Sequence, residues 1–166
     1  MPLRDHYGNP LSTASSTARD HYDTGLARFL AADIGAGDAF AAAVADDPGW
    51  ALAHAALARA LAMTGDMPGA RQAIAEAKAC APSGTAREQA HVDAMALLLS
   101  GKAPEARAAV AAHLRDHPRD ALAAQMCTNV FGLIGFSGEV GREAELLAFT
   151  SALLPHYGED WWMMSM

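Results

Sequence analysis

Cysteine is scarce in this sequence, and the placement of its cysteines excludes the usual cysteine-based frameworks. Cys80 and Cys127 are the two present, and no C-x-x-C spacing occurs. A zinc site built from paired cysteines and a disulfide-stapled fold are therefore both disfavoured. Long apolar runs are missing too. No stretch of about 20 apolar residues, the length of a membrane span, occurs. Residues 1–10 carry charges where a secretory signal would have its apolar core. We therefore expect a soluble, cytoplasmic protein with no membrane partner.

Basic residues are few and scattered. Lys and Arg number 12 against 19 Asp and Glu, which gives a formal net charge of −7. Nucleic-acid binding needs clustered basic side chains that neutralise phosphates, and no such cluster occurs. We therefore expect no nucleic-acid partner, and the acidic balance mildly favours a cationic peptide.

Signals for β-structure are also lacking. Aromatic residues make up 7% of the chain within a hydrophobic content of 52%, and the apolar share is dominated by alanine. No long alternation of β-branched and polar residues occurs. Alanine is the best helix former, so the composition indicates an all-α fold. A length of 166 residues suits a single domain.

What the chain does contain is a four-residue pattern that recurs at a nearly constant period. Its members are Ala36, Phe40, Ala43 and Pro48, then Ala70, Ile74, Ala77 and Pro82, then Ala106, Val110, His113 and Pro118. The sets begin 34 and then 36 residues apart, close to the period of tetratricopeptide (TPR) repeats. The small residue lets two helices cross closely, the larger one fills the adjacent gap, and the proline ends the unit. The pattern predicts a TPR-like α-α superhelix of about four antiparallel helical hairpins.

Turn signals set the expected helix boundaries. Gly65 and Gly101 suit left-handed helix ends, and four glycines at every third residue between 132 and 141 indicate a turn between two helices. A phosphate-binding loop is excluded there because no Lys follows. The expected helices are residues 14–33, 36–46, 49–64, 67–80, 86–100, 103–116, 119–134 and 139–154.

The end of the sequence predicts an unfinished repeat. Pro155 lies 37 residues after Pro118 and is expected to close the fourth hairpin. A truncated ninth helix begins near Asp160, and its apolar start at Trp161 and Trp162 lacks the polar face that a terminal repeat needs. We therefore expect residues 1–166 to be the N-terminal portion of a longer solenoid, or to form a homodimer through this apolar helix.

Histidines supply the main candidates for catalysis. His113, Asp116 and His117 form an H-x-x-D-H pattern that places two imidazoles one helical turn apart near a carboxylate. This is the basis of an alternative function as a metal-dependent enzyme. However, His113 occupies the alanine slot of the repeat and His117 lies at a helix exit, where a cationic side chain is favourable. We therefore expect no metal and no other cofactor.

Glu88 and His91 have the Glu-x-x-His spacing of di-iron bundles, but those need two such pairs and further glutamates. Glu88 fits better in a capping box with Thr85, in which each residue bonds the backbone amide of the other. No Ser-His-Asp or Cys-His set is recognisable by spacing, so an enzyme is not expected.

Several unlinked motifs resemble the N-terminal part of the tetratricopeptide repeat protein 38 family. They are Leu3, Arg4 and Asp5; Pro10, Leu11, Ser12 and Thr13; Tyr22 and Asp23; Ala53, His54 and Ala55; Thr85, Arg87, Glu88, Gln89, His91 and Val92; and Asp116, His117, Pro118 and Asp120. The resemblance covers about residues 3–122 and implies a helical repeat protein of greater length. It implies no catalytic residue.

The expected binding surface is the concave groove of the superhelix, lined by the first helix of each hairpin. In the best-registered unit the groove residues are Leu52, Ala55, Arg59, Ala62 and Met63, and Arg87 and His91 take comparable places in the next unit. Arg59 and Arg87 could hold a carboxylate through charge-assisted hydrogen bonds. The predicted function is a non-catalytic scaffold that holds a protein or peptide partner in this groove. The remaining alternative is a small-molecule-binding or oligomeric assembly module.

Overall fold

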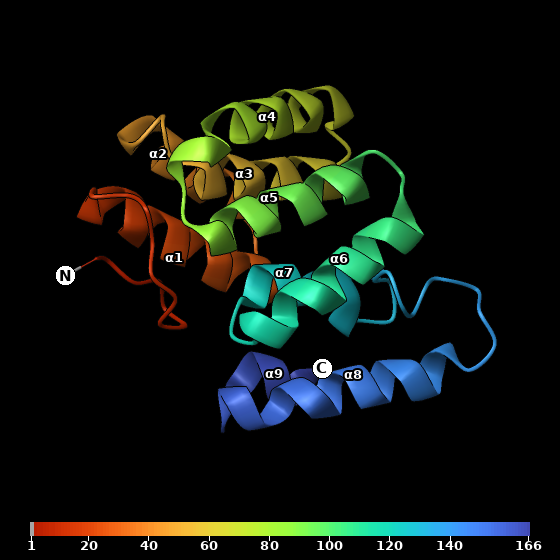
Figure 1. Cartoon of the computed structure of the whole chain (residues 1–166). Helices are drawn as coiled ribbons and strands as arrows, with labels where there is room; N and C mark the ends of the chain where they lie inside the picture. The colour runs from red at the N-terminus through yellow and green to blue at the C-terminus, as the bar shows by residue number, and fades with distance from the viewer. Residues whose placement is uncertain (1) are drawn as a thin grey trace.

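Nine α-helices and one short 3₁₀-helix follow one another in the computed structural model, which describes residues 2–166 (Figure 1). The helices are α1 (Ser16–Leu30), α2 (Ala36–Asp46), α3 (Ala51–Met63), α4 (Met67–Cys80), η1 (Ala81–Ser83), α5 (Ala86–Leu99), α6 (Ala103–Asp116), α7 (Ala121–Thr128), α8 (Arg142–Tyr157) and α9 (Trp161–Ser165). The described residues form no β-strand, and their one isolated β-bridge joins Arg4 and Pro10. The prediction of an all-α fold is confirmed.

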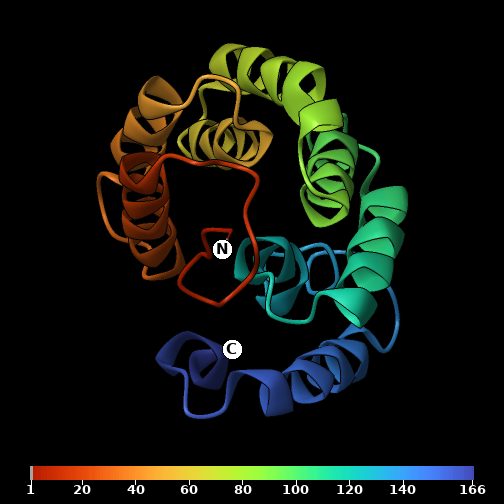
Figure 2. The ribbon, with the colours of Figure 1, turned by 60° about the vertical axis from the view of Figure 1, so that its left-hand side comes forward.

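Consecutive helices pack in pairs, α1 with α2, α3 with α4 and α5 with α6. Figure 2 shows these pairs following a curve, with the N-terminal segment and α7 on its inner side. Among the helices of residues 2–166, none combines the length and apolar character needed to cross a bilayer.

The recurring pattern marks the packed face of α2, α4 and α6, as its spacing predicts. All nine of its helical members are buried, from Ala36 in α2 to His113 in α6. Close approach is also built into α1, where a Cβ on Gly25 would lie 2.6 Å from the Phe40 ring. The core is therefore made of small residues at helix crossings and larger ones in the gaps between them.

The predicted turn chemistry is present at the hairpins. Gly65 and Gly101 have φ of 87° and 73°, a region where glycine avoids the steric cost of a side chain. Thr85 and Glu88 form the predicted capping box at the start of α5. These local signals depend on neighbouring residues alone, which is why the sequence reveals them.

Five of the eight predicted helix ranges differ from the structure at one or both ends, most of all at the end of the seventh. The helix expected over residues 119–134 ends at Thr128, because Asn129 adopts an extended backbone and the Leu133 amide donates back to the Met126 carbonyl at 2.8 Å. Residues 129–141 form turns, which agrees with the turn predicted from their glycines. Pro155 does not close α8, since the helix continues to Tyr157 with the proline inside it.

Candidate functional site

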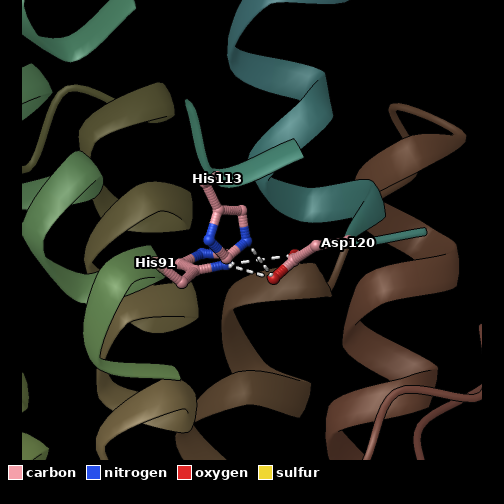
Figure 3. A group of neighbouring side chains, drawn as sticks. All are labelled: His91, His113 and Asp120. Atoms are coloured by element: carbon pink, nitrogen blue, oxygen red, sulfur yellow. Dashed lines mark hydrogen bonds and ion pairs between the residues drawn. The ribbon is translucent and has the colours of Figure 1, made fainter. Parts of the chain in front are cut away.

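The most concentrated polar chemistry in the described chain lies around one buried carboxylate, Asp120. It precedes α7 and caps that helix by accepting a bond from the Ala123 amide at 3.3 Å. His91 on α5 and His113 on α6 point at it (Figure 3). His91 Nδ1 is 3.1 Å from each carboxylate oxygen, and His113 Nε2 is 2.9 Å from Oδ2. Three helices are therefore joined at one side chain that is 2% exposed.

Arg87, one turn before His91 on α5, completes this cluster. Its Nη1 donates to Asp120 Oδ2 at 2.7 Å, and its Nη2 donates to the Pro10 carbonyl at 3.4 Å. Burial raises the pKa of Asp120, because it disfavours the ionised carboxylate. The attraction of His91, the hydrogen bonds with His113 and His91 and the charge of Arg87 lower that pKa by more, so it lies well below its usual 3.8. Asp120 is therefore the ionised centre of a buried, charge-paired group, which we call the Asp120 cluster: Arg87, His91, His113 and Asp120.

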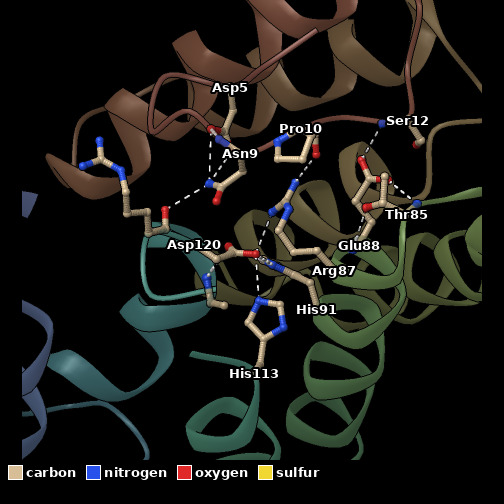
Figure 4. A network of polar contacts seen from close by, with 12 residues as sticks. Asp5, Asn9, Pro10, Ser12, Thr85, Arg87, Glu88, His91, His113 and Asp120 are labelled. Carbon is tan, nitrogen blue, oxygen red and sulfur yellow. Dashed lines mark hydrogen bonds and ion pairs between the residues drawn. The ribbon is translucent and has the colours of Figure 1, made fainter. Parts of the chain in front are cut away.

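The N-terminal segment, residues 2–15, is the other half of this network (Figure 4). The segment forms a tight hairpin in which Asp5 accepts two side-chain bonds from Asn9, at 3.2 and 2.9 Å. Asn9 also donates to the Arg119 carbonyl at 3.0 Å, and Arg119 donates to the Tyr7 carbonyl at 2.7 Å. The main chain before α1 is thus held against the turn that precedes α7.

Glu88 joins the N-terminal segment to the start of α5 and to Trp50. One carboxylate oxygen accepts from the Ser12 amide at 3.1 Å and from Trp50 Nε1 at 2.9 Å, while the other closes the capping box with Thr85 at 2.8 Å. Burial alone would raise the pKa of Glu88, but these hydrogen bonds have the larger effect, and the pKa of Glu88 is lowered overall. A residue predicted only as a cap therefore also holds the N-terminal segment and orients a buried tryptophan.

The His113–Asp116–His117 arrangement expected for a metal-dependent enzyme is not assembled. Asp116 is exposed, and His113 turns away from it toward Asp120. The group whose ligand atoms do converge, within 4.8 Å of one another, is His91, His113 and Asp120. Sequence reasoning missed this set because Asp120 belongs to the next helix.

The Asp120 cluster fits a cation poorly. Arg87 already places a fixed positive charge on the carboxylate oxygen that also faces His113. Metal-binding histidines usually donate their second ring nitrogen to a partner that orients them. Here His91 Nε2 and His113 Nδ1 are buried with no hydrogen-bond partner among the described residues. The chemistry of the cluster is that of a structural ion pair closed off from solvent.

The predicted groove residues divide into three groups by exposure. Leu52, Ala55, Arg87 and His91 are buried, Arg59 and Ala62 are half-buried, and Met63 is 59% exposed. The prediction that Arg87 and His91 line an open groove is therefore corrected, because Asp120 and the N-terminal segment cover them. Arg59 donates to Gln125 Oε1 on α7 at 3.1 Å, and Met63 lines a cavity.

An open cavity of about 610 Å³ lies between the ends of α1, α3 and α7, the start of α2, and α9. Its buried floor includes Ala36, Ala60 and Trp162, and its mouth carries exposed apolar side chains. At the mouth Ile34 is 88% and Phe131 82% exposed. We call this space the concave cavity.

The apolar end of the chain is only partly exposed. Trp162 is 1% exposed and packs edge-on against Tyr157, with ring centroids 5.7 Å apart, whereas Trp161 is 54% exposed. A homodimer through this helix stays a prediction that could use Trp161 but not Trp162.

No protein-family model matches the chain, and searches of curated proteins and of solved structures return no match.

Proposed function

We propose that the chain is a non-catalytic, TPR-like binding module that docks a partner protein at the mouth of the concave cavity. The observation that carries this proposal is the exposure of Ile34, Met63 and Phe131 around one apolar cavity. Soluble proteins rarely leave large apolar side chains grouped in this way unless the patch is used for interaction. The helical pairs and the TPR-like period of their sequence pattern support the same proposal.

The polar clusters favour a binding role over a catalytic one. Both carboxylate oxygens of Asp120 already have hydrogen-bond partners, supplied by Arg87 and two histidines. None of these side chains lines the concave cavity. A catalytic group must reach its substrate, so this cluster serves the fold. The resemblance to the tetratricopeptide repeat protein 38 family and a cytoplasmic location remain part of the proposal.

The N-terminal segment supports the idea that the inner face holds extended chain. Arg87 and Arg119 donate to main-chain carbonyls of this segment, and Glu88 accepts from one of its amides. The same face is therefore chemically suited to hold a chain. Its free part, around the concave cavity, is apolar and suits the side chains of a docking helix or loop.

Affinity purification with quantitative mass spectrometry tests the proposal. We expect Ile34→Glu combined with Phe131→Glu to lose the partner. The control is Leu147→Glu, at another exposed apolar position, on α8, and it should retain the partner. The partner is then purified and its affinity for the three proteins is measured directly. Equal affinity for all three would show that the concave cavity is not the docking surface.

A further inference from the structure

A second and smaller cavity lies between α1, the N-terminal segment and the start of α9. Its α1 wall carries Asp23, Leu26 and Leu30, whose spacing along the helix places them on one face. The volume of about 130 Å³ is too small for a drug-sized ligand, whose pockets begin at about 300 Å³. We call this space the Asp23 pocket, and its size suits a single head group.

Aromatic side chains form the other wall of the Asp23 pocket. Tyr7 is 4% exposed, and its ring lies edge-on to that of Trp162 with the centroids 6.5 Å apart, so the N-terminal segment is held against α9. Trp161 is 54% exposed and borders the pocket together with Tyr7 and His6. Aromatic rings attract cations through the negative charge of their faces. This wall therefore favours a positively charged group.

Asp23 supplies the carboxylate of the pocket. Its Oδ1 accepts from the His6 amide at 2.9 Å, whereas its Oδ2 accepts no hydrogen bond from residues 2–166. Arg19 Nε is 4.0 Å from Oδ2 and makes its short contact, at 2.6 Å, with Asp20 instead. One oxygen of a half-buried carboxylate is therefore left without a close partner.

The charges around Asp23 do not compensate it fully. Burial, aided by the negative charge of Asp5, raises the pKa of Asp23 to about 6, and the hydrogen bond from His6 and the charge of Arg19 offset only part of this effect. By contrast, the more deeply buried Asp120 is kept ionised by its own partners in the fold. A cation bound in the Asp23 pocket would supply the charge that the fold does not provide there.

We propose that the Asp23 pocket binds a methylated ammonium group, its charge paired with the Asp23 carboxylate and its methyl groups lying against Tyr7, Trp161 and Leu26. This site goes beyond the docking of a partner protein at the concave cavity and does not depend on it. The same head group occurs on free small molecules such as choline and on trimethylated lysine side chains, and the experiment distinguishes these two sources.

The lining explains why the ammonium group is methylated. An alkylammonium group has three N–H donors, and a donor that is buried without a partner costs free energy. The lining side chains other than Asp23 are aliphatic or aromatic, so they offer too few acceptors for all three. A trimethylammonium group has no N–H and makes only charge and van der Waals contacts. Aromatic walls are also the usual surroundings of quaternary ammonium ligands.

NMR titration with matched probes tests the head group. Choline, ethanolamine and dimethylbutanol share one hydroxyethyl arm; ethanolamine has the charge without the methyl groups, and dimethylbutanol has carbon in place of the choline nitrogen. The titration runs at about pH 8, above the pKa of about 6 of Asp23, with sodium chloride holding the ionic strength constant.

We expect choline to shift the indole N–H signal of Trp161 saturably. The other two probes should bind at least tenfold more weakly, a difference of about 1.4 kcal/mol. The indole of Trp50, which is buried and donates to Glu88, should not shift.

Variants test whether Asp23 and Trp161 provide this selectivity, with the methyl signals of Leu26 as the readout. Asp23→Asn keeps the oxygen that accepts from the His6 amide and removes a half-buried charge, so it should fold normally. It should weaken choline about tenfold and leave dimethylbutanol unchanged. The control Asp38→Asn removes the same charge from an exposed position outside the pocket and should leave both affinities unchanged. Trp161→Leu should weaken choline, and Trp161→Phe should restore part of its affinity.

A peptide with one trimethyllysine, compared with its unmethylated form, separates the two sources of the head group. Tighter binding of the methylated peptide than of choline assigns the pocket to a protein side chain, and the reverse order assigns it to a free small molecule. The inference is overturned if choline and dimethylbutanol bind equally, if Asp23→Asn binds choline as the parent protein does, or if choline leaves the Trp161 signal unmoved. Each of these results leaves the docking of a partner protein open to its own test.

Discussion

Removal of the Asp120 carboxylate should destabilise this protein more than any other single loss of a helix cap. Asp120→Ala deletes the N-cap of α7 and also the counter-ion of Arg87, which is 3% exposed. The change leaves a buried guanidinium with one remaining bond, a long one to the Pro10 carbonyl at 3.4 Å. It also removes Asp120 from two buried imidazole nitrogens that have no other partner among the described residues.

The magnitude follows from two contributions. Breaking a buried ion pair by removing one partner costs about 3–5 kcal/mol, and loss of an Asp N-cap costs about 1 kcal/mol. Together they amount to about 4–6 kcal/mol, against a total stability of about 5–15 kcal/mol for a typical domain. Asp120→Ala should therefore be largely unfolded near its former melting temperature and marginal at room temperature.

Urea unfolding followed by far-UV circular dichroism measures this difference. The matched control is Asp66→Ala, because Asp66 caps α4 through the Gly69 amide at 3.0 Å but is exposed and forms no ion pair with a cation among residues 2–166. We expect Asp66→Ala to lose about 1 kcal/mol. A loss in Asp120→Ala no larger than that of the control would refute the reasoning, since the buried charge would then contribute nothing.

Two further variants separate the cap from the charge. Asp120→Asn keeps a good N-cap residue and should still lose most of the stability, because Arg87 remains buried without a counter-ion. Adding Arg87→Met to Asp120→Asn should restore part of it, since the unpaired cation is then gone.

Folding lowers the pKa of Asp120 below 3.8. Its stabilisation is therefore present above pH 3.8 and lost as the pH falls through the folded-state value, so acid should unfold Asp120→Asn with a shallower pH dependence.

Three other predictions concern packing, ionisation and thiol access. Gly25→Ala should lower the free energy of unfolding by about 1–3 kcal/mol, because the new Cβ would overlap the Phe40 ring. Gly37→Ala is the control: its Cβ would meet nothing closer than 3.9 Å, and alanine adds up to about 1 kcal/mol of helix propensity. Thermal unfolding should therefore show a lower melting temperature for Gly25→Ala and a higher one for Gly37→Ala. Burial raises the pKa of Asp23 to about 6. Its contribution to stability is therefore present below pH 3.8 and lost as the pH rises through about 6. NMR of the Asp23 carboxyl group should show a titration midpoint near 6, and a midpoint near 4 would contradict the prediction. Burial raises the pKa of Cys127 to about 12, so native-state alkylation followed by mass spectrometry should modify Cys80 and spare Cys127.

Helix positions with a local cause could be predicted. The repeating small and large residues, the capping box of Thr85 and Glu88, and the left-handed glycines at Gly65 and Gly101 all appear in the structure where the sequence places them. Each of these features involves residues within about one helical turn, or one helix face, so neighbours in the sequence suffice to identify it.

Predictions that required the path of the chain were incomplete. The helix expected to run to residue 134 stops at Thr128, and the early end of α7 leaves Phe131 exposed at the mouth of the concave cavity. Arg87 and His91, predicted to line an open groove, are buried on a face of α5 that is covered. What covers it comes from residues 2–15 and from Asp120, which lie far from α5 in the sequence.

Residue spacing alone was enough to predict that this chain folds as helices and which face of α2, α4 and α6 is buried, because helix propensity and apolar spacing act over one or two turns. Only the tertiary structure decided how the polar residues pair. Asn9 meets the Arg119 carbonyl across 110 residues, and Arg87 meets Asp120 across 33. It also separated two arginines that the sequence pattern predicts to be comparable: Arg87 is neutralised within the chain, whereas Arg59 has no acid beside it in the described residues. The physical reason is that a buried charge is governed by whatever the fold brings within a few ångströms, and residue spacing along one helix does not record that.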